Sequence, residues 1–135
     1  KIKCNYKIVA HSDGDVLLHS IADSILGAAG LGDIGMFFSD QDNKNKNLDS
    51  TLIIEHCLNE LNKMDLEIYN IDTTIICENP KINPHREKIL ENLSAILKVP
   101  INKIGLKATT SEKIGIIGNN EAISVQSIVN LKDLS

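Results

Sequence analysis

The chain has 135 residues, of which 42% are hydrophobic and 24% charged, and this length suits one domain with a single core. A net charge of −4 argues against a broad nucleic-acid surface, where clustered Lys and Arg are expected. No apolar run approaches the roughly 20 residues that a membrane-spanning helix requires.

The first half of the chain predicts one strand and two helices. Residues 1–10 are expected to form the strand. A helix over residues 15–30 begins after a Ser-Asp-Gly turn and ends at glycines. A second helix over residues 49–64 has one apolar stripe, made of Ile53, Ile54, Cys57, Leu58, Leu61 and Met64. Between the helices, the polar stretch 40–47 is predicted to be a surface loop.

The second half predicts three strands and one helix. Residues 68–77 alternate as a strand, with Ile71, Thr73, Ile75 and Cys77 on one face. A helix follows Asn83-Pro84, which we expect to supply its N-cap and first residue. Residues 104–109 and 122–132 are the last two strands. The sequence therefore predicts a single α+β domain over residues 1–135, an α/β sandwich whose mixed four-stranded sheet is covered on one side by helices.

The densest group of polar residues runs from Ala10 to Ser24. Asp15, His19 and Asp23 are spaced four apart, so a helix places them on one face. They are either a metal ligand with its orienting carboxylates or a solvated polar stripe, and these residues taken alone favour the stripe. In the turn before them, His11 and Ser12 could hold a phosphate, while Ser12 and Asp15 could equally form a capping box.

Three later loops carry polar groups with two interpretations each. Asp33, between glycines, could accept hydrogen bonds from a sugar diol or could serve a turn at the helix end, and Phe37 and Phe38 beside it favour a core position. The loop ENPKINPH, residues 78–85, could present backbone groups and Lys81 to a planar base or could only connect a strand to a helix.

The third loop is KATTSEK, residues 107–113. Thr109 and Glu112 have capping-box spacing, so Glu112 could serve a helix start. If Glu112 instead points at phosphates, a carboxylate there requires a bridging Mg²⁺ or Mn²⁺. Only one arginine, Arg86, is present, and the three scattered cysteines form no C-x-x-C pair. The candidates therefore lack an obvious nucleophile, and any phosphate recognition depends on lysines, hydroxyls, backbone N–H groups and metal ions.

The order of these motifs resembles the 2-C-methyl-D-erythritol 2,4-cyclodiphosphate synthase family. The resemblance is collinear from about Ala10 to Leu131 and rests on HSDGDVLLH, LGDIG, FSDQD, DSTLIIE, IDTTII, NPKINPH and KATTSEK. It implies a homotrimer with active sites between subunits, a Zn²⁺ in each site and a second divalent ion, Mg²⁺ or Mn²⁺.

The resemblance also implies roles for single residues. His19 matches the zinc-binding histidine, and Glu112 matches the ligand of the second ion. The positions that match contacts to the erythritol, ribose and diphosphate parts of the substrate are His11, Ser12, Asp33, Gly35, Phe38, Asp40, Thr109 and Thr110, with Thr110 also expected to be catalytic. The positions that match the cytosine site of the neighbouring subunit are Cys77, Pro80, Lys81, Ile82, Asn83 and Ala108.

Two departures from the family pattern stand out. The family's other two zinc ligands belong to an N-terminal Gly-x-Gly-x-Asp-x-His segment, which this sequence does not contain, and we expect that segment in the natural protein. In addition, Ile116 and Asn119 stand where many relatives have an aromatic residue and an arginine that line the central channel of the trimer.

The resemblance implies a reaction without a protein nucleophile. The 2-phosphate of 4-diphosphocytidyl-2-C-methyl-D-erythritol 2-phosphate attacks the β-phosphorus, and CMP leaves as the cyclic diphosphate of the non-mevalonate isoprenoid pathway forms. A bacterial protein of this kind is expected in the cytoplasm, and a plastid-bearing eukaryote would keep it in the plastid stroma. The alternative is a non-catalytic module of the same fold that binds a cytidine nucleotide or a metal. A generic metal phosphohydrolase is disfavoured, because it would cluster more His and Asp ligands than four scattered histidines provide.

Overall fold

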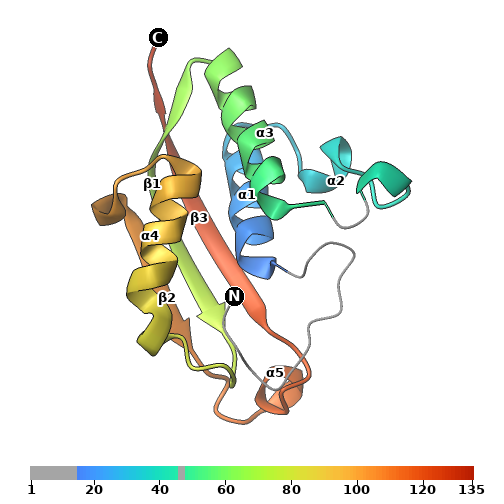
Figure 1. Ribbon diagram of the computed structural model, residues 1–135, viewed down its shortest axis with the longest axis vertical. Coiled ribbons are helices and arrows are strands. Elements are labelled where there is room, and N and C mark those ends of the chain that lie inside the picture. The colour runs from blue at the N-terminus through green and yellow to red at the C-terminus, as the bar shows by residue number, and fades with distance from the viewer. Residues whose placement is uncertain (1–14, 46–47) are drawn as a thin grey trace.

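A computed structural model describes residues 15–45 and 48–135. Three strands form a mixed sheet in the order β2-β1-β3: β1 (Leu66–Ile76), β2 (Ile104–Thr109) and β3 (Ser124–Asp133). The central strand β1 pairs parallel with β2 and antiparallel with β3. The parallel pairing makes β1 and β2 finish at the same end of the sheet, as Figure 1 shows.

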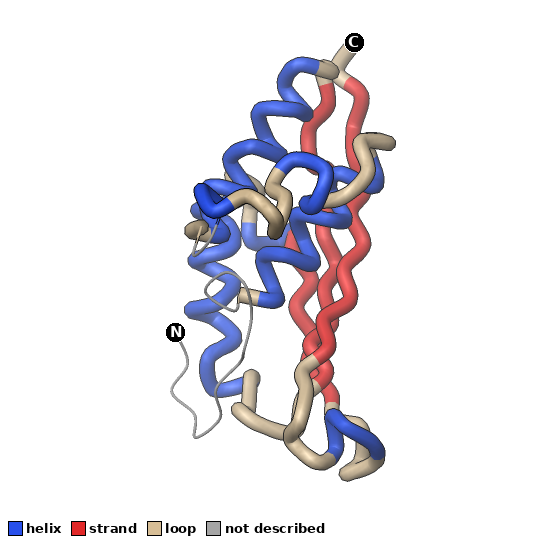
Figure 2. The backbone as a smooth tube through the Cα atoms, turned by 90° about the vertical axis from the view of Figure 1, so that its right-hand side faces the viewer, coloured by secondary structure: helices blue, strands red, loops and turns tan. Residues whose placement is uncertain are grey.

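Three long helices cover one face of the sheet. They are α1 (Val16–Ala28), α3 (Ser50–Lys63) and α4 (Arg86–Leu97), and Figure 2 shows them together on one side of the strands. The remaining helical segments are short: α2 (Ile34–Phe37), α5 (Gly115–Gly118) and 3₁₀ turns at Asn43–Asn45, Asn83–His85 and Ile101–Lys103.

Aspartates define where α1 and α3 begin. The Asp15 carboxylate accepts a hydrogen bond of 3.1 Å from the Leu18 amide, and the Asp49 carboxylate accepts one of 2.9 Å from the Thr51 amide. These caps satisfy backbone donors that the first turn of a helix leaves unpaired. Hydrogen bonding to Thr51 also lowers the pKa of the Asp49 carboxyl.

The core lies between the helices and the sheet, and aliphatic side chains dominate it. Ile21, Ile25 and Ile54 are fully buried, and Ile71 and Leu106 meet them from the sheet. The predicted face of β1 is confirmed, since Ile71, Thr73, Ile75 and Cys77 are all buried. Such a core stabilises the domain mainly by removing apolar surface from water.

The prediction of an α+β domain with helices on one side of a mixed sheet is confirmed. The described ranges contain three strands rather than four, because the strand expected over residues 1–10 lies outside them. Asn83 is not the N-cap of α4, since Asn83 and Pro84 belong to a 3₁₀ turn and α4 begins only at Arg86. The capping box of Thr109 and Glu112 is also wrong, because β2 runs through Thr109 and no helix starts there.

Candidate active site

A cavity of about 210 Å³ opens where β1 and β2 end, and we call it the strand-end cavity. It exists because the Cys77 amide continues the parallel ladder by donating to the Thr109 carbonyl at 3.0 Å, after which the two chains diverge. Its lining consists of eight residues from the end of β2 and from the segments that follow β1 and β2: Cys77, Pro80, Lys81, Ile82, Asn83, Ala108, Thr109 and Thr110.

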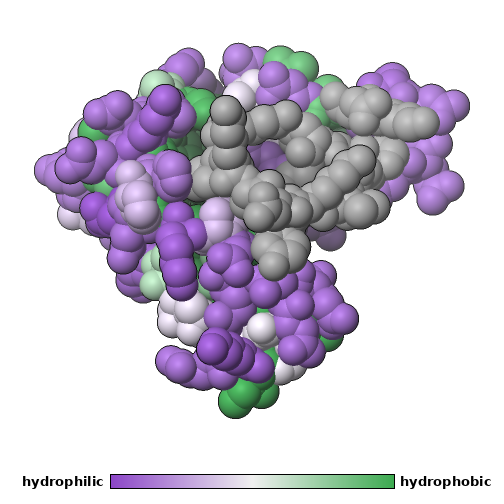
Figure 3. All heavy atoms as spheres, turned by 60° about the horizontal axis from the view of Figure 1, so that its bottom comes forward, coloured by the Kyte–Doolittle hydropathy of each residue, from purple (hydrophilic) through white to green (hydrophobic). Residues whose placement is uncertain are grey.

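The lining combines a buried apolar floor with a polar rim. Cys77 and Ile82 are 5% and 7% exposed, and the Cys77 thiol lies 3.5 Å from the Pro80 carbonyl oxygen. Lys81, Asn83 and Thr109 are exposed at the rim. An apolar floor with a few polar groups around it can accept a heterocycle and hydrogen-bond its edge. Hydrophilic side chains cover most of the described surface at this end of the molecule (Figure 3).

Glu112 lies in the turn that follows β2, beside this cavity in sequence but outside its lining. Its amide donates a hydrogen bond of 3.2 Å to the Thr110 hydroxyl, and its side chain is exposed. Glu112 and Lys113 both have positive φ, of 55° and 62°. The carboxylate is therefore displayed on a tight turn, where a ligand could reach it from solvent.

His19 lies at a second location, on α1, where its ring meets the start of α3. Its Nε2 is 3.1 Å from the Ser50 hydroxyl, and Ser50 is 1% exposed. A hydrogen bond from one ring nitrogen to a fixed polar group is the contact that orients metal-bound histidines in general. Ser50 was not among the predicted site residues, although it follows the capping Asp49 directly.

The carboxylates spaced four residues from His19 have structural roles. Asp15 caps α1, and the Asp23 carboxylate accepts a hydrogen bond of 2.8 Å from the Ile34 amide. No group of three His, Cys, Asp or Glu side chains that could hold a metal ion occurs among the residues described. In that part of the chain His19 therefore stands as the histidine predicted to bind zinc, with the Ser50 hydroxyl beside its ring.

The segment around α2 holds the other predicted site residues. The Asp33 carboxylate caps α2 by accepting a hydrogen bond of 3.2 Å from the Met36 amide, and Asp33, Gly35 and Asp40 are exposed. The half-buried Phe38 packs edge-on against the ring of His56, with ring centroids 5.2 Å apart. His56 also contacts Phe37 at 4.7 Å, so one imidazole on α3 supports both phenylalanines. No sequence signal indicated this role for His56, because His56 lies in an ordinary helical pattern.

The structure thus brings together the predicted cytosine-site residues with Thr109 and Thr110, and keeps them apart from His19 and from the α2 segment. His11 and Ser12 lie outside the described residues. Glu78 is a further residue that the sequence did not single out, and its carboxylate bonds the turn that carries Glu112.

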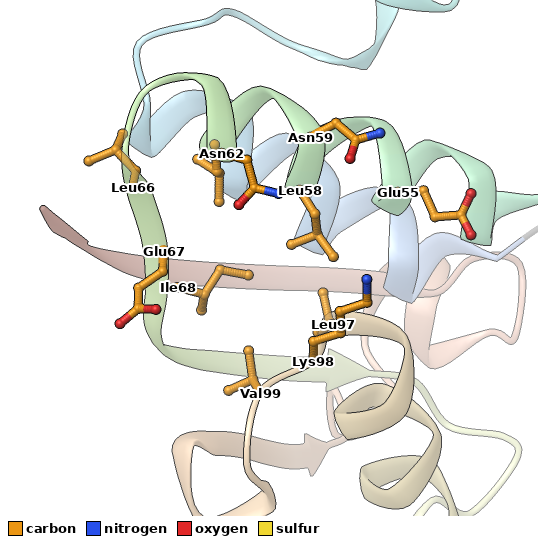
Figure 4. A pocket seen from close by; sticks show the side chains of 11 residues that line it. Glu55, Leu58, Asn59, Asn62, Leu66, Glu67, Ile68, Leu97, Lys98 and Val99 are labelled. Atoms are coloured by element: carbon orange, nitrogen blue, oxygen red, sulfur yellow. The ribbon is translucent and has the colours of Figure 1, made fainter. Parts of the chain in front are cut away.

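A larger cavity of about 330 Å³ lies at the opposite end of β1 and contains none of the predicted residues. Figure 4 shows its lining, which comes from the end of α3, the start of β1 and the end of α4. Aliphatic side chains such as Leu58, Ile68 and Val99 alternate there with the charged Glu55, Glu67 and Lys98.

No helix in the described ranges is both long enough and apolar enough to cross a membrane.

The model of the YgbB family matches residues 1–132. Among the curated relatives, the bifunctional enzyme IspD/IspF of Aliarcobacter butzleri is 47% identical over 132 residues, which cover 98% of this chain and 35% of that protein. The 2-C-methyl-D-erythritol 2,4-cyclodiphosphate synthase of Leptospira interrogans is 45% identical over 90% of this chain and 77% of its own length. The chain thus spans about a third of the bifunctional relatives and about three quarters of the shorter ones.

Solved structures agree with the sequence relatives. The bifunctional IspDF of Campylobacter jejuni superimposes with a TM-score of 0.87 at 43% identity, over 93% of this chain and 34% of that one. The CDP complex of IspF from Plasmodium falciparum gives a TM-score of 0.84 at 35% identity, over 94% and 76% of the two chains. The chain belongs to the YgbB family, in common with proteins named 2-C-methyl-D-erythritol 2,4-cyclodiphosphate synthase.

Proposed function

We propose that the protein converts 4-diphosphocytidyl-2-C-methyl-D-erythritol 2-phosphate to 2-C-methyl-D-erythritol 2,4-cyclodiphosphate and CMP. The observation that carries this proposal is the strand-end cavity. Its eight lining residues are the six expected at the cytosine site together with the two threonines expected beside the diphosphate. Family members solved with CDP support a cytidine nucleotide as the ligand.

In the proposed complex the strand-end cavity holds the nucleotide end of the substrate. The cytosine ring lies over Ile82 and Cys77, and the polar rim hydrogen-bonds its edge. Thr109 and Thr110 leave the cavity toward Glu112, so their hydroxyls are suited to contact the diphosphate. The protein would thereby fix the β-phosphorus at a defined distance from the base.

Cyclisation then needs the 2-phosphate to approach the β-phosphorus in line. An oxygen of the 2-phosphate forms the new P–O bond while the bond from the β-phosphorus to the oxygen bridging to the α-phosphorus breaks, and CMP carries that oxygen away. The attacking oxygen is already anionic at neutral pH, so the chain needs no general base. Positioning by the α2 segment, with Phe38 and Asp40 as the wall around the erythritol, lowers the barrier by holding the reactants together.

Two residues would hold metal ions in this arrangement, His19 for a zinc or similar divalent ion and Glu112 for Mg²⁺ or Mn²⁺. Bound divalent ions supply the positive charge that neutralises the phosphates as they approach. The contact between Ser50 and His19 would keep the imidazole oriented toward the metal ion.

We further propose that the active protein is a homotrimer in the bacterial cytoplasm. Within a single chain, the strand-end cavity lies apart from His19 and from the α2 segment. This separation suits an active site that a neighbouring copy of the chain completes. Ile128 of β3 alternates with the buried Val129, so it points away from the core, and it is 68% exposed. The mass of the protein in solution, measured by light scattering, tests the trimer directly.

The test of the function is turnover of the CDP-linked substrate by the full natural protein, with and without EDTA. Equal amounts of CMP and the cyclic diphosphate, lost on chelation, are the expected result. CMP without the cyclic product would indicate a hydrolase. No turnover with cytidine nucleotides still bound would favour the non-catalytic binding module.

A further inference from the structure

The carboxylate of Glu78 joins the two loops of the strand-end cavity. Glu78 follows Cys77 at the end of β1 and is only partly exposed. Its Oε1 accepts hydrogen bonds of 3.1 Å from the Ser111 amide and 3.1 Å from the Lys113 amide. The Ser111 hydroxyl lies 3.4 Å from the same oxygen but is closer, at 2.8 Å, to the Ile114 carbonyl. The two backbone amides are therefore the main partners of Glu78.

The two amides lie on either side of Glu112, in a turn whose backbone conformation is unfavourable for non-glycine residues. Glu112 and Lys113 are consecutive non-glycine residues in the left-handed region, where the side chain crowds the backbone. Such backbone persists only when the surrounding structure imposes it, and it gathers at functional sites. Local bonds hold part of the turn, since the Glu112 amide donates to the Thr110 hydroxyl and the Ile114 amide donates to the Ser111 carbonyl. The Glu78 carboxylate adds a restraint from the other loop, because it accepts from both amides that flank Glu112.

Two further contacts make the turn part of a fixed unit. A Cβ added to Gly118 would lie 2.2 Å from the Lys113 carbonyl carbon, so α5 packs against the backbone of the turn. The Asn79 side-chain amide donates a hydrogen bond of 3.0 Å to the Asn120 side chain. The loop that begins at Glu78 is thus bonded to the turn and to the end of α5.

We infer that Glu78 is a positioning residue that sets the direction of the Glu112 carboxylate and couples it to the strand-end cavity. The inference rests on the proposed function, in which Glu112 holds the second divalent ion. Loss of the Glu78 carboxylate would let residues 111–113 relax toward ordinary backbone conformations and would carry Glu112 away from the phosphates. A glutamine keeps an acceptor oxygen but lacks the charge that strengthens hydrogen bonds to backbone amides.

The experiment compares Glu78→Ala and Glu78→Gln with Glu91→Ala, which removes an exposed glutamate of α4. Turnover is measured in the full natural protein at saturating substrate over a range of Mn²⁺ concentrations. We expect Glu78→Ala to raise the half-saturating Mn²⁺ concentration about 10-fold, the lower end of the effect of residues that orient metal ligands. The half-saturating Mn²⁺ concentration of Glu78→Gln is expected to lie between those of Glu78→Ala and the wild type, and that of Glu91→Ala should equal the wild-type value. The affinity for free cytidine should be the same in all variants.

A second readout does not depend on activity. Hydrogen exchange of the Ser111 and Lys113 amides, followed by NMR in the metal-free protein, should accelerate in Glu78→Ala and not in Glu91→Ala. An unchanged Mn²⁺ dependence in a wild type that turns over would overturn the inference, as would unchanged exchange at both amides. If the wild type does not turn over, the proposed function fails, and amide exchange alone decides the role of Glu78. Should Glu78→Ala not fold, Glu78→Gln provides both readouts.

Discussion

The hydroxyl of Ser20 donates a hydrogen bond of 2.8 Å to the hydroxyl of Ser127, which ties α1 to β3 at the position next to His19. The Ser127 hydroxyl is also 2.9 Å from that of Thr73, which is fully buried on β1. Ser24, one turn along α1, donates to the Ser127 carbonyl at 2.9 Å. Hydrogen bonds are directional whereas apolar contacts are not, so these hydroxyls fix where α1 lies along the sheet.

Replacing Ser127 with alanine is expected to destabilise the protein by about 1–2 kcal/mol, because Ser20 and Thr73 lose a shared partner inside the core. Urea unfolding measures the change, and Ser135→Ala at the exposed end of the chain is the control. The double variant Ser20→Ala with Ser127→Ala should lose less than the sum of the single losses, since the residues share one interaction. Strictly additive losses would show that the two hydroxyls act independently.

Replacing His19 with alanine tests the proposed metal ligand. Loss of residues that only orient a ligand costs about 10–100-fold in activity or metal affinity, so loss of the ligand itself should reduce turnover by at least about 100-fold. The fold should persist, because His19 is only partly buried and α1 keeps its cap and its apolar face. His85→Ala, at an exposed histidine, is the matched control. Near-normal turnover by His19→Ala would remove His19 from the metal site.

Replacing Ala108 with leucine tests the strand-end cavity as a nucleotide site. The larger side chain projects into a cavity of about 210 Å³, and Ala108 is exposed, so binding should suffer more than folding. We expect CDP binding, measured by calorimetry, to be lost while stability changes by no more than about 0.5 kcal/mol. Ala95→Leu on the exposed side of α4 introduces the same side chain elsewhere and should bind CDP normally. Undiminished CDP affinity in Ala108→Leu would place the nucleotide at another site.

We expect the free energy of unfolding to decrease at alkaline pH because of the Cys57 thiol. Burial, with a smaller contribution from the nearby Asp23 carboxylate, raises the pKa of the Cys57 thiol from 9.0 to about 12. The folded protein therefore keeps the thiol proton at a pH where the unfolded chain releases it, so the free energy of unfolding falls as pH rises from about 9 toward about 12.

Urea unfolding of the wild type and Cys57→Ala over the lower part of that pH range isolates this contribution, because other titrating groups are common to both proteins. The wild type is expected to lose stability more steeply with pH. Parallel pH dependences would mean that the thiol titrates in the folded protein much as it does in the unfolded chain.

The helices and strands could be predicted from the amino-acid sequence, because the signals that specify them are local. Periodicity located α3 to within one residue at each end and the ends of β2 without error, and it named the buried face of β1. Glycines and prolines marked the loops, and the motif order identified the family, since a collinear set of short motifs needs no geometry to be recognised.

The roles of the loop residues depend on contacts between segments that are distant in sequence. Glu112 has capping-box spacing from Thr109, yet the pairing of β2 with β1 extends through Thr109 and leaves Glu112 on a left-handed turn. Asp23 shares a helix face with His19, yet the path of the chain brings the Ile34 amide to it instead. Glu78, Ser50 and His56 act through partners that are 33–35, 31 and 18–19 residues away in sequence. No local pattern encodes such contacts, because they form only when the parallel pairing of β1 with β2 and the packing of α1 on α3 bring distant segments together.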